Sequence, residues 1–108
     1  MTTATFLVRG GSHVGFRITG HTADYDTEQG RLVCSAVSSA AYMAANTVTE
    51  VIGAAADASV DDAKMVLMVT SPDERTQAVI AGLEFHLHGL QQQYPDYIKV
   101  NLEVQPNA

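Results

Sequence analysis

The sequence predicts an α+β domain in which two helices pack on one face of a single-layer mixed sheet, in the order ββα(β)βαβ. Three observations predict this class. The N-terminal region alternates apolar and polar residues around a double glycine, two later stretches repeat apolar residues every three or four positions, and the C-terminal stretch alternates again. The 108 residues suffice for one hydrophobic core, so we expect a single domain over residues 1–108.

The first element is a β-hairpin. Apolar residues alternate on both sides of Gly10-Gly11, which is a turn signal. The alternating residues are Ala4, Phe6 and Val8 before the turn, and Val14, Phe16 and Ile18 after it. Gly20 closes the second strand, and a polar loop that contains Asp24 and Asp26 follows.

The next element is a helix of about five turns that begins near Leu32 and ends near Gly53. Its apolar residues recur at three- and four-residue steps: Val33, Val37, Ala40, Ala41, Ala44, Val48, Val51 and Ile52. A polar connection with a short strand around 58–60 leads to an apolar strand at 64–70.

A second helix is predicted by its capping residues. Ser71 is the expected N-cap, Pro72 occupies the first helical position and Glu74 completes a capping box. The apolar stripe consists of Val79, Ile80, Leu83, Leu87, Leu90 and Tyr94. Pro95 ends the helix, and a last strand spans residues 97–104.

The last strand alternates cleanly, which is typical of a sheet covered by helices on one face only. Its apolar side consists of Ile98, Val100, Leu102 and Val104. The opposite sheet face would then be open. Either this open face or a helix face could support a dimer, and the pattern does not choose between them.

Composition excludes several classes of protein. The formal net charge is -6 with only six Lys plus Arg, which argues against a nucleic-acid surface. This acidity suits a basic peptide partner, although it also serves solubility alone. One cysteine excludes an internal disulfide framework and fits a reducing cytosol. The N-terminus lacks a signal-peptide pattern and no apolar run is long enough for a membrane helix, so we expect a cytoplasmic protein.

The lone thiol and a histidine could form a catalytic pair. If the helix begins near Leu32, Cys34 lies in its first turn, where free N–H groups and the helix dipole stabilise a thiolate. The N–H groups of Cys34 and Ser35 could then hold an oxyanion. His21, at the end of the second strand, could reach the sulfur across the loop. From spacing alone, an ordinary buried core cysteine remains the alternative.

Metal binding is not expected. On a helix, His86 and His88 lie about 200° apart and cannot share an ion. Glu84 and His88 share a face, but two ligands make a weak site. No cofactor is implied.

Two motifs resemble the bacterial ribosomal-processing cysteine protease family, a small α/β family formerly of unknown function. They are contained in "GHTADYD" and "RLVCSAVSSAAYMAANTV". Gly20-His21 matches the family's histidine motif, with Thr22 where alanine is usual. Leu32-Val33-Cys34 and Val37-Ser38 match the cysteine motif, and "LQQQYPDYIKVNL" resembles the family's C-terminal ending.

The resemblance implies an endopeptidase that removes the N-terminal extension of ribosomal large-subunit protein twenty-seven during ribosome assembly. It makes Cys34 the nucleophile and His21 the base, and it implies a homodimer. Ser38 falls at a family site position, where its hydroxyl could bond substrate, or instead bond the helix carbonyl four residues back.

One departure concerns Arg31, which stands where the family usually has aspartate. Arg31 cannot accept a hydrogen bond, so it cannot orient the histidine as an acid would. Asp24 or Asp26 could supply the missing carboxylate and, with Glu28, attract a basic substrate segment; a solvated acidic loop is the alternative. The rival functions are a non-enzymatic dimeric ribosome-associated binding module and a thiol-based redox or acyl-transfer enzyme.

Overall fold

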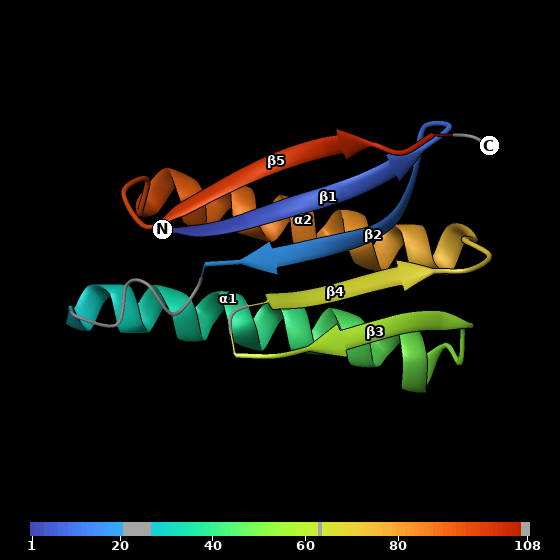
Figure 1. The fold of residues 1–108 in the computed structure, drawn as a ribbon, viewed down its shortest axis with the longest axis horizontal. Coiled ribbons are helices and arrows are strands. Elements are labelled where there is room, and N and C mark those ends of the chain that lie inside the picture. Colours follow the sequence, from blue (N-terminus) through green and yellow to red (C-terminus); the bar gives the residue numbers. More distant parts are fainter. Residues whose placement is uncertain (21–26, 63, 107–108) are drawn as a thin grey trace.

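A computed structural model describes residues 1–20, 27–62 and 64–106 of the protein. Five strands, two long helices and a short π-helix follow one another along these residues (Figure 1). They are β1 (Thr2–Arg9), β2 (Ser12–Thr19), α1 (Glu28–Asn46), η1 (Thr47–Val51), β3 (Ala56–Val60), β4 (Lys64–Val69), α2 (Glu74–Gln93) and β5 (Ile98–Val104). The predicted element order is therefore confirmed.

The strands form one mixed sheet in the order β3-β4-β2-β1-β5. β1 pairs antiparallel with β2 and parallel with β5, so the first and last strands of the chain are neighbours. In register, Phe6 lies beside Phe16 and Leu102, and Phe16 lies beside Leu67. This places the apolar residues of adjacent strands on the same face of the sheet.

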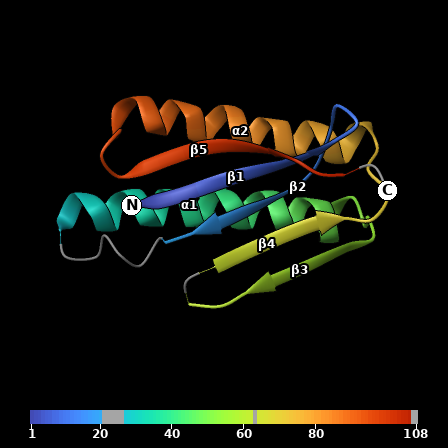
Figure 2. The same ribbon diagram turned by 45° about the horizontal axis from the view of Figure 1, so that its top comes forward.

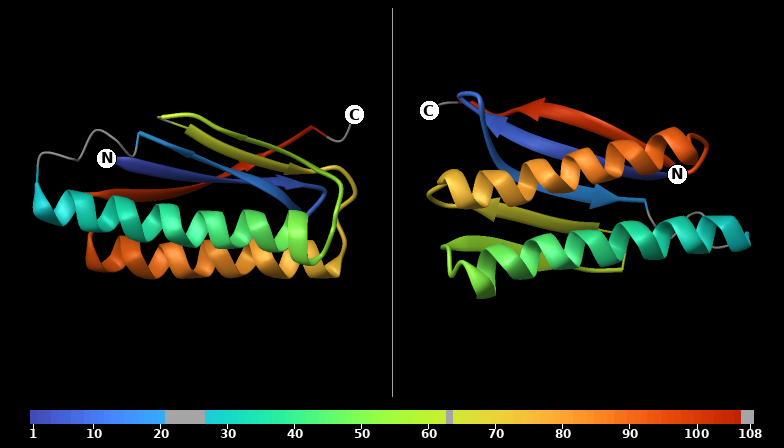
Figure 3. Two further views of the ribbon diagram at one scale, coloured as in Figure 1. Left: turned by 90° about the horizontal axis from the view of Figure 1, so that it is seen from below. Right: turned by 180° about the vertical axis from the view of Figure 1, so that it is seen from behind.

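Both helices cover that apolar face, as predicted. Figure 2 and the left view of Figure 3 show α1 and α2 side by side in one layer, running in opposite directions, with the sheet on one side of them. The core between the layers includes Phe6, Phe16, Val37, Leu67, Ile80 and Leu87, all fully buried. Large side chains buried in this way supply most of the stabilisation of a domain of this size.

The hairpin turn has the expected backbone. Gly10 and Gly11 adopt φ of 58° and 80°. Glycine adopts this left-handed region without steric cost, and consecutive positive φ values match the twist of a tight hairpin. The double glycine therefore sets the β1–β2 connection.

The first helix begins four residues earlier than predicted. The expected start near Leu32 is wrong, because α1 begins at Glu28. The hydroxyl of Thr27 accepts a hydrogen bond from the Gly30 N–H at 2.9 Å, which is an N-cap. Figure 1 shows that the early turns of α1 extend beyond the end of β2.

The end of this helix lies near Gly53 as predicted, but its last turn is wider than an α-helix. Thr47 donates its hydroxyl to the Met43 carbonyl at 2.7 Å, and Thr49 donates to the Ala45 carbonyl at 3.1 Å. Such bonds compete with the regular backbone bonds and distort a helix locally. The π-helix η1 follows α1, and Gly53 then reverses the chain with φ of 73°.

The second helix uses a different cap from the one predicted. Its N-cap is Asp73, so the assignment of Ser71, Pro72 and Glu74 to the cap, first position and capping box is wrong. The Asp73 carboxylate accepts from the N–H groups of Arg75 and Thr76, and the Thr76 hydroxyl accepts from the Asp73 N–H. This reciprocal pair satisfies more donors than Ser71 could.

We expect the Asp73 cap to make the stability of the fold depend on pH in the acidic range. The hydrogen bond from the Thr76 backbone, followed by that from the Arg75 side chain, lowers the pKa of Asp73. A lowered pKa in the folded state stabilises the fold above the unfolded value of about 3.9, and this contribution is lost as the pH falls through the folded pKa. Melting curves at pH 6 and pH 3 should therefore show a smaller acid-induced fall for Asp73→Asn, which keeps a cap without a titrating group. An equal fall in both proteins would contradict this.

The last strand is only partly covered. Ile98 is buried as predicted, but Leu102 and Val104 on the same face are exposed. Figure 1 shows that α2 diverges from β5 toward the end of the strand. The alternating pattern thus predicts the face correctly and overestimates how far the helices cover it.

The opposite sheet face is polar and carries its own ion pair. Arg17 on β2 reaches across β1 to Glu103 on β5, with Nη2 and Oε1 2.9 Å apart. On the intervening strand, Thr5 and Leu7 point to this face and are nevertheless buried. The hydrogen bond from Arg17 lowers the pKa of Glu103, so the pair stays ionised near neutral pH.

Gly15 lies where the backbones of β2 and β4 approach closely. A Cβ built at this position would overlap the Leu67 carbonyl oxygen and press on the Met68 sulfur. We therefore expect Gly15→Ala to lower the free energy of unfolding by about 1–3 kcal/mol, as over-packing typically does. Urea unfolding of this variant measures the loss. Gly89→Ala, where the new Cβ meets no atom within 4 Å, should instead raise stability by about 0.5–1 kcal/mol.

Candidate functional site

Cys34 lies on one flank of α1 with two other predicted site residues. Ser38 follows Cys34 by four residues and Arg31 precedes it by three, so all three project from the same side of the helix. The thiol is buried, with 2% of the residue exposed, while Ser38 is half-buried and Arg31 exposed. The flank therefore combines a thiol, a hydroxyl and a cation.

The predicted oxyanion donors at Cys34 and Ser35 are wrong. Because α1 begins at Glu28, both residues lie in its second turn. Their N–H groups point to the carbonyls of Gly30 and Arg31 in the regular helical pattern. An oxyanion must therefore find other donors, and the predicted position of Cys34 in the first turn of the helix is wrong. Ser35 itself is exposed.

Three predicted site residues, His21, Asp24 and Asp26, lie outside the described residues. The described chain leaves β2 at Gly20 and resumes at Thr27, immediately before α1. Gly20 has φ of 73°, and a Cβ there would lie 2.7 Å from the Met1 carbonyl oxygen. Only glycine fits this position, which fixes the direction in which β2 ends.

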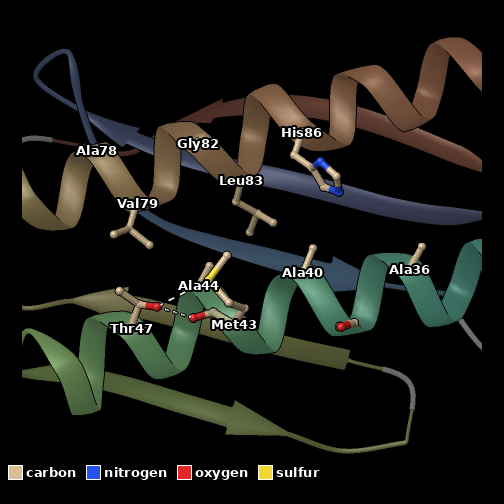
Figure 4. Close-up of a pocket in the computed structure, with 11 residues that line it drawn as sticks. Ala36, Ala40, Met43, Ala44, Thr47, Ala78, Val79, Gly82, Leu83 and His86 are labelled. Carbon is tan, nitrogen blue, oxygen red and sulfur yellow. Dashed lines mark hydrogen bonds between the residues drawn. The ribbon is translucent and has the colours of Figure 1, made fainter.

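A groove runs between the two helices on the side away from the sheet. It has a volume of about 660 Å³, and Figure 4 shows Val79 and Leu83 pointing from α2 toward α1. Its walls include Ala36, Ala40 and Met43 of α1, with Val79, Gly82 and His86 of α2; we call this the helix groove. Cys34 and Ser38 lie about 200° from Ala36 around α1, on the opposite flank.

Two histidines, His13 and His88, lie close to the carboxylate of Glu84 on α2. Nε2 of His13 on β2 lies at hydrogen-bond distance, 2.8 Å, from Oε1 of Glu84 on α2. Nε2 of His88 lies 4.0 Å from Oε2, the second carboxylate oxygen of Glu84. No sequence pattern indicates a partner for His13, because a contact between residues 71 positions apart leaves no local pattern. Among the described residues, no group of three or more His, Cys, Asp or Glu side chains could hold a metal ion.

No described helix is both long and apolar enough to cross a membrane.

Comparison with known families identifies the protein family of this chain. The family described as cysteine protease Prp matches residues 1–99, nearly the whole chain. The chain belongs to this family. As a member of the Prp family it is a cysteine protease, and Cys34 is the one cysteine of its sequence.

Solved structures share the Prp fold over almost their full length. SMU.848 from Streptococcus mutans superposes with a TM-score of 0.84 at 22% identity, covering 97% of this chain and 96% of that one. The ribosomal processing protease Prp from S. aureus, in complex with a substrate peptide, superposes with a TM-score of 0.86 at 18% identity, covering 95% and 100%. The same protease with a covalently linked product peptide gives 0.81 at 18% identity, with the same coverage. No curated protein matches the sequence.

Proposed function

We propose that this Prp family member removes the N-terminal extension of ribosomal large-subunit protein twenty-seven during ribosome assembly, using Cys34 and His21. The observation that carries the proposal is the family match over residues 1–99, which includes both residues. The fold is also that of a protease from S. aureus whose structures hold a substrate peptide and a covalently linked product peptide. Ribosomes are assembled in the bacterial cytoplasm, so the reaction belongs there.

The first half of the reaction forms an acyl-enzyme. The Cys34 thiolate attacks the scissile carbonyl carbon, and a tetrahedral intermediate forms. His21, protonated, donates its proton to the leaving nitrogen as the carbon–nitrogen bond breaks. The downstream peptide leaves as an amine, and the upstream peptide remains as a thioester on Cys34.

The second half releases the acyl group. His21 takes a proton from water, whose oxygen attacks the thioester carbonyl. The carbon–sulfur bond breaks, which releases a carboxylic acid and regenerates the thiol. Because Cys34 is only 2% exposed, the substrate must displace the groups that cover the sulfur before attack. Ser38, on the same flank, would donate its hydroxyl to the bound peptide.

Charge supports a basic substrate. The chain carries twelve acids and six Lys plus Arg, and ribosomal proteins bind RNA through basic segments. Asp24, Asp26 and Glu28 would attract such a segment to the sequence between His21 and Cys34. Arg31 adds a cation beside the thiol and takes the place of the family's usual acid. We also propose that the protein acts as a homodimer.

The test is incubation of the purified protein with the precursor of ribosomal large-subunit protein twenty-seven. We expect one cut that removes the N-terminal extension, read as two product masses by mass spectrometry. The matched control is the mature form of the same substrate, which should remain uncut. If the precursor stays intact after prolonged incubation with enzyme whose cysteine is kept reduced, the proposed substrate is refuted.

A further inference from the structure

Lysine and arginine gather on the side of the sheet that faces away from the helices, which we call the open sheet face. Strand register places four of the six Lys and Arg residues of the chain there: Arg9, Arg17, Lys64 and Lys99. The described strands carry two acids on this face, Asp57 and Glu103. The protein as a whole has a net charge of -6, so its positive charge is concentrated on one side.

One row of side chains crosses the open sheet face from β4 to β5. Lys64 pairs with Thr19, and Thr19 pairs with Thr3. Thr3 pairs in turn with Lys99, so three strand spacings of about 4.8 Å set the two lysines about 14 Å apart. Arg9 lies six residues along β1 from Thr3, which is a distance of about 20 Å. These cations therefore lie too far apart to share one small anion.

Three of the four cations have no acidic partner among the described residues. Arg17 is paired with Glu103, with Nη2 and Oε1 2.9 Å apart. Arg9, Lys64 and Lys99 are exposed and make no ion pair with a described acid. The chain has twelve acids, so a shortage of carboxylates does not explain this. Unpaired ammonium and guanidinium groups are available to an external anion such as phosphate.

We propose that the open sheet face binds double-stranded RNA through its phosphate backbone. Cations spread over about 14 by 20 Å match a polyanion whose phosphates repeat along a strand, whereas a small anion would meet only one of them. Thr3, Thr19 and Asn101 lie between the cations and add hydrogen-bonding groups for phosphate and ribose 2′-OH. The choice of RNA among polyanions rests on the ribosome-assembly function proposed above.

The side chains of this face suit the backbone of a duplex better than unpaired bases. Recognition of single-stranded RNA uses aromatic side chains on which the bases stack. The described strands place no aromatic residue on the open sheet face, since Phe6 and Phe16 both lie buried on the side that the helices cover. Contacts to phosphate and ribose carry no sequence information, so we expect binding that is independent of RNA sequence.

The average charge of the chain argues against an RNA surface, but it does not report where the charges lie. Screening shortens the reach of exposed charges to about 8 Å at physiological salt. A phosphate on the open sheet face therefore senses the cations beside it more than the acids of the helix layer. The left view of Figure 3 shows both helices on the other side of the sheet, so bound RNA leaves Cys34 on α1 clear of the contact.

Fluorescence anisotropy of a labelled RNA duplex of about 16 base pairs, titrated with the full chain at about 50 to about 200 mM salt, tests the surface. We expect the logarithm of the binding constant to fall against that of the salt concentration with a slope of about -3, one for each unpaired cation. Lys64→Gln/Lys99→Gln should raise the dissociation constant at least about tenfold at low salt and reduce this slope by about two.

The matched control is Gln77→Glu/Gln92→Glu, which makes the same change in net charge on α2, beyond the sheet. Its affinity for the duplex should stay within a factor of about two of wild type. Circular dichroism checks that both double variants keep the fold. Equal losses in the two double variants would show that net charge, and not the open sheet face, governs binding, and would overturn the proposal.

Glu103→Gln provides a test that unfolding cannot imitate. It releases Arg17 from its ion pair and adds a fourth unpaired cation to the face. We expect tighter binding, by at least about threefold at low salt, and a slope that is steeper by about one. An affinity that does not rise would contradict the placement of RNA on this face.

Two further outcomes would overturn the proposal. One is an unchanged anisotropy with wild type up to about 100 µM, the weak end of non-specific binding. The other is displacement of the duplex by poly-glutamate of matched charge as readily as by unlabelled RNA, which would assign the face to acidic peptides. The precursor cleavage assay contains no RNA. Cleavage without RNA binding therefore refutes only the surface, and RNA binding without cleavage refutes only the substrate.

Discussion

Cys34→Ala should abolish proteolysis and leave the fold in place. The protein has one thiol, and loss of a catalytic nucleophile lowers kcat by more than about 10⁴-fold in enzymes of this kind. Removing one buried sulfur atom should cost only about 1 kcal/mol of stability. The measurement is the initial rate of precursor cleavage, together with a thermal melt of both proteins.

A second substitution separates chemistry from packing. Cys34→Ser keeps the volume of the side chain at a position that is 2% exposed, so its melting curve should match the wild type more closely than that of Cys34→Ala. Its hydroxyl is a far weaker nucleophile, so its activity should be lost equally. Substantial cleavage by either variant would show that Cys34 is not the nucleophile.

His21→Ala should reduce turnover by about 10²–10⁴-fold, the range expected for loss of a general acid–base group. The thiol remains in this variant, so added imidazole should restore part of the rate by carrying the proton. The same imidazole should not restore Cys34→Ala, because no nucleophile is left. Cleavage rates with and without imidazole provide the measurement.

The matched histidine control is His88→Ala on α2. His88 is half exposed and lies 4.0 Å from Glu84, away from the Cys34 flank, so its removal should leave the cleavage rate within a factor of about two. Equal losses in His21→Ala and His88→Ala would indicate a general effect on the protein and contradict a specific role for His21.

The sequence predicts the architecture well because periodicity reports burial directly. The alternation around Gly10-Gly11 identifies the hairpin, and the three- and four-residue steps from Val33 to Val48 identify the helix that covers it. The face of β5 is also predicted, since Ile98 is buried as the pattern requires. These features depend on which side of an element is apolar.

Element ends are predicted less well, because they depend on hydrogen bonds rather than on burial. The helix was expected to begin near Leu32, yet the Thr27 hydroxyl caps the N–H of Gly30, which lies buried inside α1. Ser71-Pro72 looked like a helix start, yet Asp73 and Thr76 bond one another's backbone two residues later. The four-residue error at α1 moved Cys34 from the first turn to the second and produced the incorrect oxyanion donors.

The catalytic role proposed for Cys34 rests on the motif and not on the geometry. Spacing alone allows Cys34 to be an ordinary core cysteine, and its 2% exposure is what a core cysteine would show. The pairing of Gly20-His21 with Leu32-Val33-Cys34 carries the family resemblance, and the match over residues 1–99 confirms the family. The departure at Arg31 is visible only against that motif.

The pairing of β1 with β5 ties completion of the sheet to the synthesis of β5. Thr2 lies beside Ile98 and Val8 beside Val104, and the Gln105 N–H donates to the Val8 carbonyl at 2.6 Å. A nascent chain that has emerged only as far as β4 can form the hairpin and α1, but β1 then has one unpaired edge. The native sheet is complete only when β5 has docked beside β1. Such long-range contacts slow folding, so this pairing should form later than the β1–β2 hairpin.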